Sequence, residues 1–144
     1  MAPSENTTAF FVSDLHGKTP RYEKLFRAIE DEKPGAVFIG GDILPHLDPP
    51  DFSGDRFMKG YFLSELEKLK DRLGSEYPRI FVILGNDDGK QDEQLLMDAD
   101  QQGLVDYIHG RRAELSSWQV FGYAYVPPTP FRLKDWEKYD VSRY

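Results

Sequence analysis

One short stretch decides the fold: Ala36-Val37-Phe38-Ile39-Gly40-Gly41-Asp42, an apolar run that ends in two glycines and an aspartate. Two further runs, Thr8–Val12 and Ile80–Leu84, are also rich in aromatic or β-branched residues, and the later one also ends at a glycine. Continuous apolarity, without alternation, is typical of strands buried on both faces, as in a parallel sheet. We therefore predict three strands that each lead into a polar tip.

Between these runs lie residues with the i, i+3, i+4, i+7 spacing that is typical of a helix with one buried face. The first face consists of Tyr22, Leu25, Phe26 and Ile29, and the second consists of Phe62, Leu66, Leu69 and Leu73. Thr19 and Pro20 suit the N-cap and first position of the first helix, and Gly74 suits the C-cap of the second. The order β-α-β-α-β implies right-handed crossovers. We therefore predict the fold class α/β, with a parallel-containing sheet and flanking helices.

The region after Gly89 carries weaker patterns. We predict a helix at 91–102, short strands at 105–108 and 120–126, and a helical tail at 133–139. The Pro- and Asp-rich stretch at 45–55 is predicted to be a loop, because both residue types favour turns.

The composition places the chain among ordinary globular domains. Its 144 residues are 40% hydrophobic and 30% charged, which is typical of one domain. With 18 basic and 25 acidic side chains, the net charge of −7 argues against stable binding of nucleic acid or an anionic membrane. The absence of cysteine excludes a disulfide framework, a thiolate nucleophile and a Cys-based zinc site. We see no secretory signal and no apolar stretch near the ~20 residues of a membrane helix, so we expect a cytoplasmic protein with no membrane partner.

The three predicted strand tips carry the chemistry of the chain. Their sequences are Ser13-Asp14-Leu15-His16-Gly17, Gly40-Gly41-Asp42 and Gly85-Asn86-Asp87-Asp88-Gly89. Because sites in open α/β sheets form outside the carboxyl ends of strands, we expect these side chains at one edge of the sheet. Carboxylates gathered in one pocket would raise one another's pKa values, and divalent cations would neutralise them. Carboxylate, imidazole and amide donors together suit Mn, Fe or Zn.

Each tip taken alone has a simpler explanation, because Asp-x-His, Gly-Gly-Asp and Gly-Asn-Asp-Asp-Gly are all compatible with ordinary turns. Their joint placement at strand ends favours a metal site. Competing motifs fail on spacing: a Walker A loop needs four residues between its glycines, whereas Gly85 and Gly89 enclose three. A Rossmann fingerprint needs further glycines after the first strand, where only Gly17 stands.

Asp14-x-His16, Gly41-Asp42 and Gly85-Asn86-Asp87-Asp88 together resemble the first three motifs of the calcineurin-like metallophosphoesterases. The resemblance implies a fold like the first half of the family's four-layer αββα sandwich. It also implies two divalent metal ions (Mn, Fe or Zn): Asp14 and His16 would bind the first, Asp42 would bridge, and Asn86 would bind the second. The implied activity is hydrolysis of a phosphomonoester or phosphodiester by a metal-bound hydroxide, with a phosphorylated small molecule or nucleotide as substrate.

Two departures from the family pattern shape the functional expectation. Asp87 stands where the family usually has a histidine, and Asp88 matches its acidic partner, so both are candidate catalytic residues. The family's downstream histidine motifs are missing, since His109 is the only histidine after the third motif. His46, on the loop after the second strand, is a candidate substrate-binding residue.

Because of the missing motifs, we expect residues 1–144 to form a single, truncated domain that is the N-terminal part of a longer enzyme. Such a chain would bind one ion well, or none, and would be weakly active or inactive. The alternative is a non-catalytic metal-binding or interaction module that keeps only the first three motifs. Half of a sandwich would leave a sheet edge or an apolar face uncovered, so we also expect a homo-oligomer.

Overall fold

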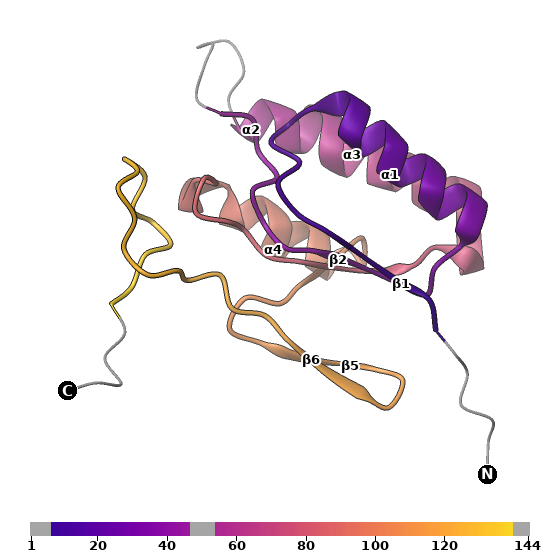
Figure 1. Ribbon diagram of the computed structural model, residues 1–144. Helices are drawn as coiled ribbons and strands as arrows, with labels where there is room; N and C mark the ends of the chain where they lie inside the picture. The colour runs from indigo at the N-terminus through magenta and orange to yellow at the C-terminus, as the bar shows by residue number, and fades with distance from the viewer. Residues whose placement is uncertain (1–6, 47–53, 140–144) are drawn as a thin grey trace.

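A parallel sheet of four strands lies at the centre of the protein (Figure 1). The computed structural model describes residues 7–46 and 54–139. The strands are β1 (Ala9–Val12), β2 (Ala36–Ile39), β3 (Arg79–Val82) and β4 (Asp106–Tyr107), and their order in the sheet is their order in the chain. All three strand pairs are parallel, so the predicted α/β class with a parallel sheet and flanking helices is confirmed.

The longer helices between the strands are α1 (Thr19–Glu32), α3 (Leu63–Leu73) and α4 (Glu93–Gln101). Shorter elements are α2 (Gly54–Phe57), the π-helical turn η1 (Met58–Phe62) and the 3₁₀ turns η2 (Gly74–Glu76) and η3 (Lys90–Asp92). Lys18, and not Thr19, occupies the N-cap of α1, because its backbone is still extended. Gly74 ends α3 with a φ of 55°, as the sequence predicted. Among the described residues, no helix combines the length and apolarity needed to cross a bilayer.

The three longer helices pack on the same face of the sheet. A right-handed crossover places its helix on one side, and strands that follow in chain order repeat the same step. One buried cluster on this face joins strand residues to the helices: Val37, Ile39, Ile80 and Val82 with Tyr22, Leu25, Phe26, Ile29, Phe62, Leu66, Leu69 and Leu96. This shared core fixes the strands relative to one another and thereby brings their tips together, because a close-packed interior tolerates little displacement.

The opposite face of the sheet is only partly covered. The hairpin of β5 (Arg112–Leu115) and β6 (Trp118–Phe121) lies on that side, away from α1 and α3 (Figure 1). A groove of about 1440 Å³ is lined by residues of both the hairpin and the sheet, and its apolar lining includes Phe11, Phe38, Phe81, Leu115, Trp118 and Phe121. Phe11 and Trp118 are each 74% exposed. The prediction of strands buried on both faces is therefore wrong for β1, because the hairpin packs against β2 and β3.

The C-terminal third follows the sequence prediction in part. The helix predicted at 91–102 forms as η3 and α4, and the strand predicted at 105–108 forms as β4. The strand predicted at 120–126 ends at Phe121, and its partner β5 was missed because Ala and Glu are uncommon in strands. The predicted helical tail at 133–139 is wrong, since this segment forms turns around the fully buried Trp136. Most of the predicted loop at 45–55 lies outside the described residues.

We expect the open face to make the protein self-associate, because a contiguous exposed apolar patch favours contact over hydration. Replacing two aromatic residues of the groove together, Phe11→Ser and Trp118→Ser, should shift the mass measured by light scattering toward that of the monomer at high concentration. Met97→Ser is the matched control, because Met97 is an exposed apolar residue of α4 outside the groove. A wild-type chain that stays monomeric at high concentration would contradict this expectation.

Candidate metal centre

The tips of β1 and β2 are joined by backbone hydrogen bonds. The bonds run from the N–H of Asp14 to the carbonyl of Gly41 (3.1 Å), from His16 to Asp42 (2.8 Å) and from Gly17 to Ile43 (2.9 Å). The hydroxyl of Tyr22, on the buried face of α1, donates to the carbonyl of Ile43 at 2.5 Å. Because both loops share this short ladder, the side chains of the first two motifs are held beside each other.

Three candidate ligands have a left-handed backbone. The φ angles are 58° at Asp14, 49° at His16 and 54° at Asp42. Among the described non-glycine residues, only Lys33 and Ser116 share this conformation. Such a conformation costs about 1 kcal/mol or more for a residue with a side chain, and it gathers at functional sites. The strain at this one edge of the sheet therefore supports a site that needs these side chains in these positions.

The tip of β3 contacts the tip of β2 at Asp42. The backbone N–H of Asp87 donates to Oδ1 of Asp42 at 3.0 Å. Gly85 lies so close to Asp42 that a Cβ atom at this position would collide with Oδ1 of the carboxylate. Only glycine allows this approach of the two loops, so Gly85 is part of the site although it offers no ligand.

Asp88 holds the second and third tips together. Its side chain is fully buried, and its carboxylate accepts hydrogen bonds from the N–H groups of Ile43 (3.1 Å), Leu44 (2.9 Å) and Gly85 (2.8 Å). Burial raises the pKa of Asp88 to about 6, although these three donors pull the pKa down. Because both oxygens accept hydrogen bonds from backbone donors, Asp88 positions the two loops, and its catalytic role stays a prediction.

Donor atoms of Asp14, His16 and Asp42 lie within 4.8 Å of one another. Nε2 of His16 is 3.6 Å from Oδ1 of Asp14, and Nδ1 of His16 is buried without a hydrogen-bond partner. Burial raises the pKa of Asp42, and the nearby carboxylates of Asp87 and Asp14 add to this rise. A divalent cation would relieve the repulsion between the carboxylates. The residues present therefore fit a metal ion.

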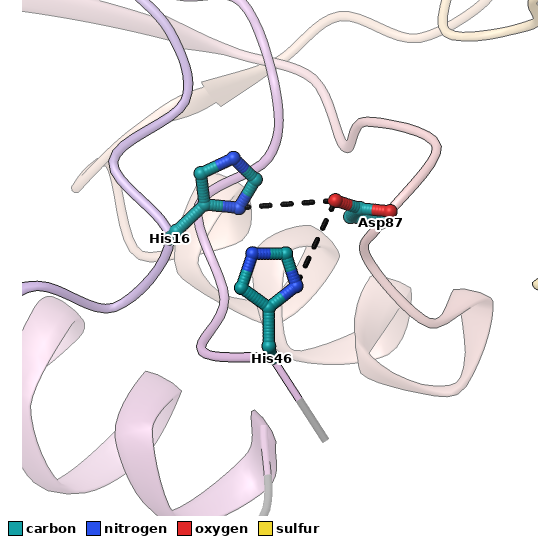
Figure 2. Close-up of side chains that lie close together, drawn as sticks. All are labelled: His16, His46 and Asp87. Atoms are coloured by element: carbon teal, nitrogen blue, oxygen red, sulfur yellow. Dashed lines mark ion pairs between the residues drawn. The ribbon is translucent and has the colours of Figure 1, made fainter. Parts of the chain in front are cut away.

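His46 and Asp87 line the same site. The ring of His46 stacks on that of His16, with centroids 4.5 Å apart and planes at 19°. Nδ1 of His46 lies 3.8 Å from Oδ2 of Asp87, and Figure 2 shows both imidazoles beside this carboxylate. The structure thus brings Asp14, His16, Asp42, His46 and Asp87 together. Asn86 is partly buried on the loop that carries Asp87, and its ligand role stays a prediction.

Two features of the site surroundings were missed by the sequence reasoning. The indole Nε1 of Trp136 donates to the backbone carbonyl of Asp88 at 3.0 Å, so the C-terminal segment supports the third loop. His109 has a structural contact: its Nδ1 accepts the N–H of Ala124 at 3.0 Å, and its ring packs edge-on against that of Trp136. No local pattern signals either contact, because each depends on how the segment after β6 folds back.

Comparison with known proteins supports the fold alone. No family model matches this chain, and no curated protein matches it. Three chains of solved structures match, and one of them is a crystal structure with a TM-score of 0.55 and 16% sequence identity. The match covers 87% of this chain and 56% of the other, so the present chain spans little more than half of that protein's length. The shared class is a mixed α/β fold with a parallel sheet flanked by helices.

Removing the Asp88 carboxylate should destabilise the protein strongly. Asp88→Ala leaves three backbone N–H groups without an acceptor, and each costs about 1–3 kcal/mol when buried. We expect urea unfolding to show a loss of at least about 3 kcal/mol. Asp71→Ala, on the exposed side of α3, is the matched control and should change little. Equal stability of the two variants would show that Asp88 does not hold the loops.

Removing the charge of Asp42 should stabilise the metal-free protein. Asp42→Asn keeps the oxygen that accepts the Asp87 N–H and removes a half-buried charge beside two other carboxylates. In the presence of a chelator we expect the melting temperature to rise by about 3 °C, or about 1 kcal/mol. Excess Mn²⁺ should raise the melting temperature of the wild type and leave that of the variant unchanged. A variant that melts below the wild type in chelator would contradict this prediction.

Proposed function

We propose that this chain is a metal-dependent phosphoesterase domain, related to the calcineurin-like metallophosphoesterases, that binds a divalent cation through Asp14, His16 and Asp42. One observation carries the proposal: the tips of β1 and β2 bring donor atoms of all three ligands within 4.8 Å of one another, and each ligand has a strained left-handed backbone. A structural turn would not need carboxylates and an imidazole in these positions. The proposed substrate is a phosphorylated small molecule or a nucleotide, as a phosphomonoester or phosphodiester.

The roles of the surrounding residues follow from their placement. A bound divalent ion would supply Lewis-acid activation of water and of the phosphoryl oxygens. Asp42 lies between the tips of β1 and β3 and accepts the backbone N–H of Asp87. Asp88 accepts the backbone N–H of Ile43 and so holds the loop after β2 to the loop after β3. His46 is largely exposed at the rim, where its imidazole can contact a phosphoryl oxygen. Asp87, also at the rim, is our candidate for the catalytic residue beside the leaving group.

The alternative of a non-catalytic metal-binding or interaction module has an observation of its own. The apolar groove on the far side of the sheet exposes Phe11 and Trp118, which favours contact with another surface. The two candidates differ in whether metal binding leads to turnover.

Hydrolysis of a chromogenic phosphate ester tests the proposal. With bis(4-nitrophenyl) phosphate and Mn²⁺, we expect weak, metal-dependent turnover, because the downstream histidine motifs that supply further metal ligands in the family do not occur in these 144 residues. Asp42→Asn should lower the rate at least ten-fold, whereas Asp71→Asn, distant on α3, should not. Mn²⁺ binding without any turnover would favour the non-catalytic module. Turnover that is unchanged by chelator or by Asp42→Asn would overturn the proposed site.

A further inference from the structure

A second group of donors lies beside the proposed centre and has a different chemistry. It consists of His16 from the tip of β1, His46 from the loop after β2, and Asp87 from the tip of β3. Their donor atoms also lie within 4.8 Å of one another. The family pattern accounts for only one of these residues as a ligand, since His46 is outside the motifs and Asp87 replaces a histidine.

The distances within this group suit a shared ion better than direct pairing. Oδ2 of Asp87 lies 4.0 Å from Nδ1 of His16 and 3.8 Å from Nδ1 of His46 (Figure 2). Both distances exceed a hydrogen bond, which ends near 3.2 Å. With metal–ligand bonds of about 2.1 Å, two ligand atoms of one ion lie up to about 4.2 Å apart, and about 3.4 Å in a tetrahedron. Small shifts of side chains at the rim would complete such a geometry.

The orientation of the two imidazole rings also supports a shared ion. His16 and His46 are stacked, and the Nδ1 atom of each is the nitrogen closest to the same oxygen of Asp87. A cation between the two Nδ1 atoms and Oδ2 of Asp87 would be bound by lone pairs of all three atoms. Nδ1 of His16 is buried without a hydrogen-bond partner, so no protein group satisfies this nitrogen.

We propose that His16, His46 and Asp87 form a nitrogen-rich site for Zn²⁺, distinct from the oxygen-rich group of Asp14, His16 and Asp42. Two imidazoles and one carboxylate favour Zn²⁺, whereas one imidazole and two carboxylates favour Mn²⁺. A neutral imidazole has one free lone pair, so the His16 ring serves one group at a time. The two ligand sets therefore compete for His16, and the identity of the metal selects between them. The zinc site does not depend on phosphoesterase activity.

The test compares metal affinities of the tag-free chain of 144 residues and its variants by competition with a chromogenic chelator. His46→Gln removes an exposed ligand without touching the core, and it should weaken Zn²⁺ binding at least ten-fold while Mn²⁺ affinity stays within two-fold. Asp87→Asn should behave in the same way. Asp14→Asn should show the opposite pattern, with Mn²⁺ binding weakened at least ten-fold. His109→Gln is the matched control, because His109 lies outside both groups.

Each outcome decides between the two sites. Unchanged Zn²⁺ affinity in both His46→Gln and Asp87→Asn would overturn the zinc site. A wild type that binds Zn²⁺ with the expected variant pattern, but does not bind Mn²⁺, would leave the zinc site standing and remove the proposed phosphoesterase centre. Loss of Zn²⁺ binding in His109→Gln with no loss in His46→Gln would place the ion elsewhere and contradict the proposal. Circular dichroism of each variant confirms that it is folded.

Discussion

A single buried carboxylate organises this molecule. Asp88 accepts backbone hydrogen bonds from the loop after β2 and from the start of its own loop, and its backbone carbonyl accepts the Trp136 indole. Charge-assisted bonds of this kind are strong because neither partner is exposed to water. Asp88 fixes the backbone of the two loops that carry Asp42 and Asp87. The acidic side chains of the site are therefore held in place around Asp42.

The sheet topology explains why the donors meet at one edge. Parallel strands end on the same side, and neighbours in chain order bring their tips within reach without long connections. The same rule places the helices on one face and leaves the other face to the hairpin. One constraint thus produces both the polar edge and the apolar groove.

Much of the fold could be predicted from the sequence, because the apolar runs and helix stripes are local patterns. The first three strands, the faces of α1 and α3, and the gathering of Asp14, His16 and Asp42 were expected and are found. The positioning role of Asp88 could not be predicted, because the sequence does not show whether an aspartate in a motif faces solvent or buried backbone N–H groups. The stacking of His46 on His16 could not be predicted because it depends on the path of a loop. The left-handed backbone of the ligands could not be predicted either, because residue type shows only that Asp and His tolerate this conformation.

The chain contains two tryptophans in opposite surroundings. Trp136 is fully buried and its indole is bonded to the loop that carries Asp87 and Asp88, whereas Trp118 stands largely in solvent on the hairpin. The buried indole should emit at shorter wavelengths than the exposed one. Intrinsic fluorescence is therefore a built-in optical reporter of this protein. Emission at shorter wavelengths, from Trp136, should change when a ligand binds at the polar edge, and emission at longer wavelengths, from Trp118, should change when the groove is covered.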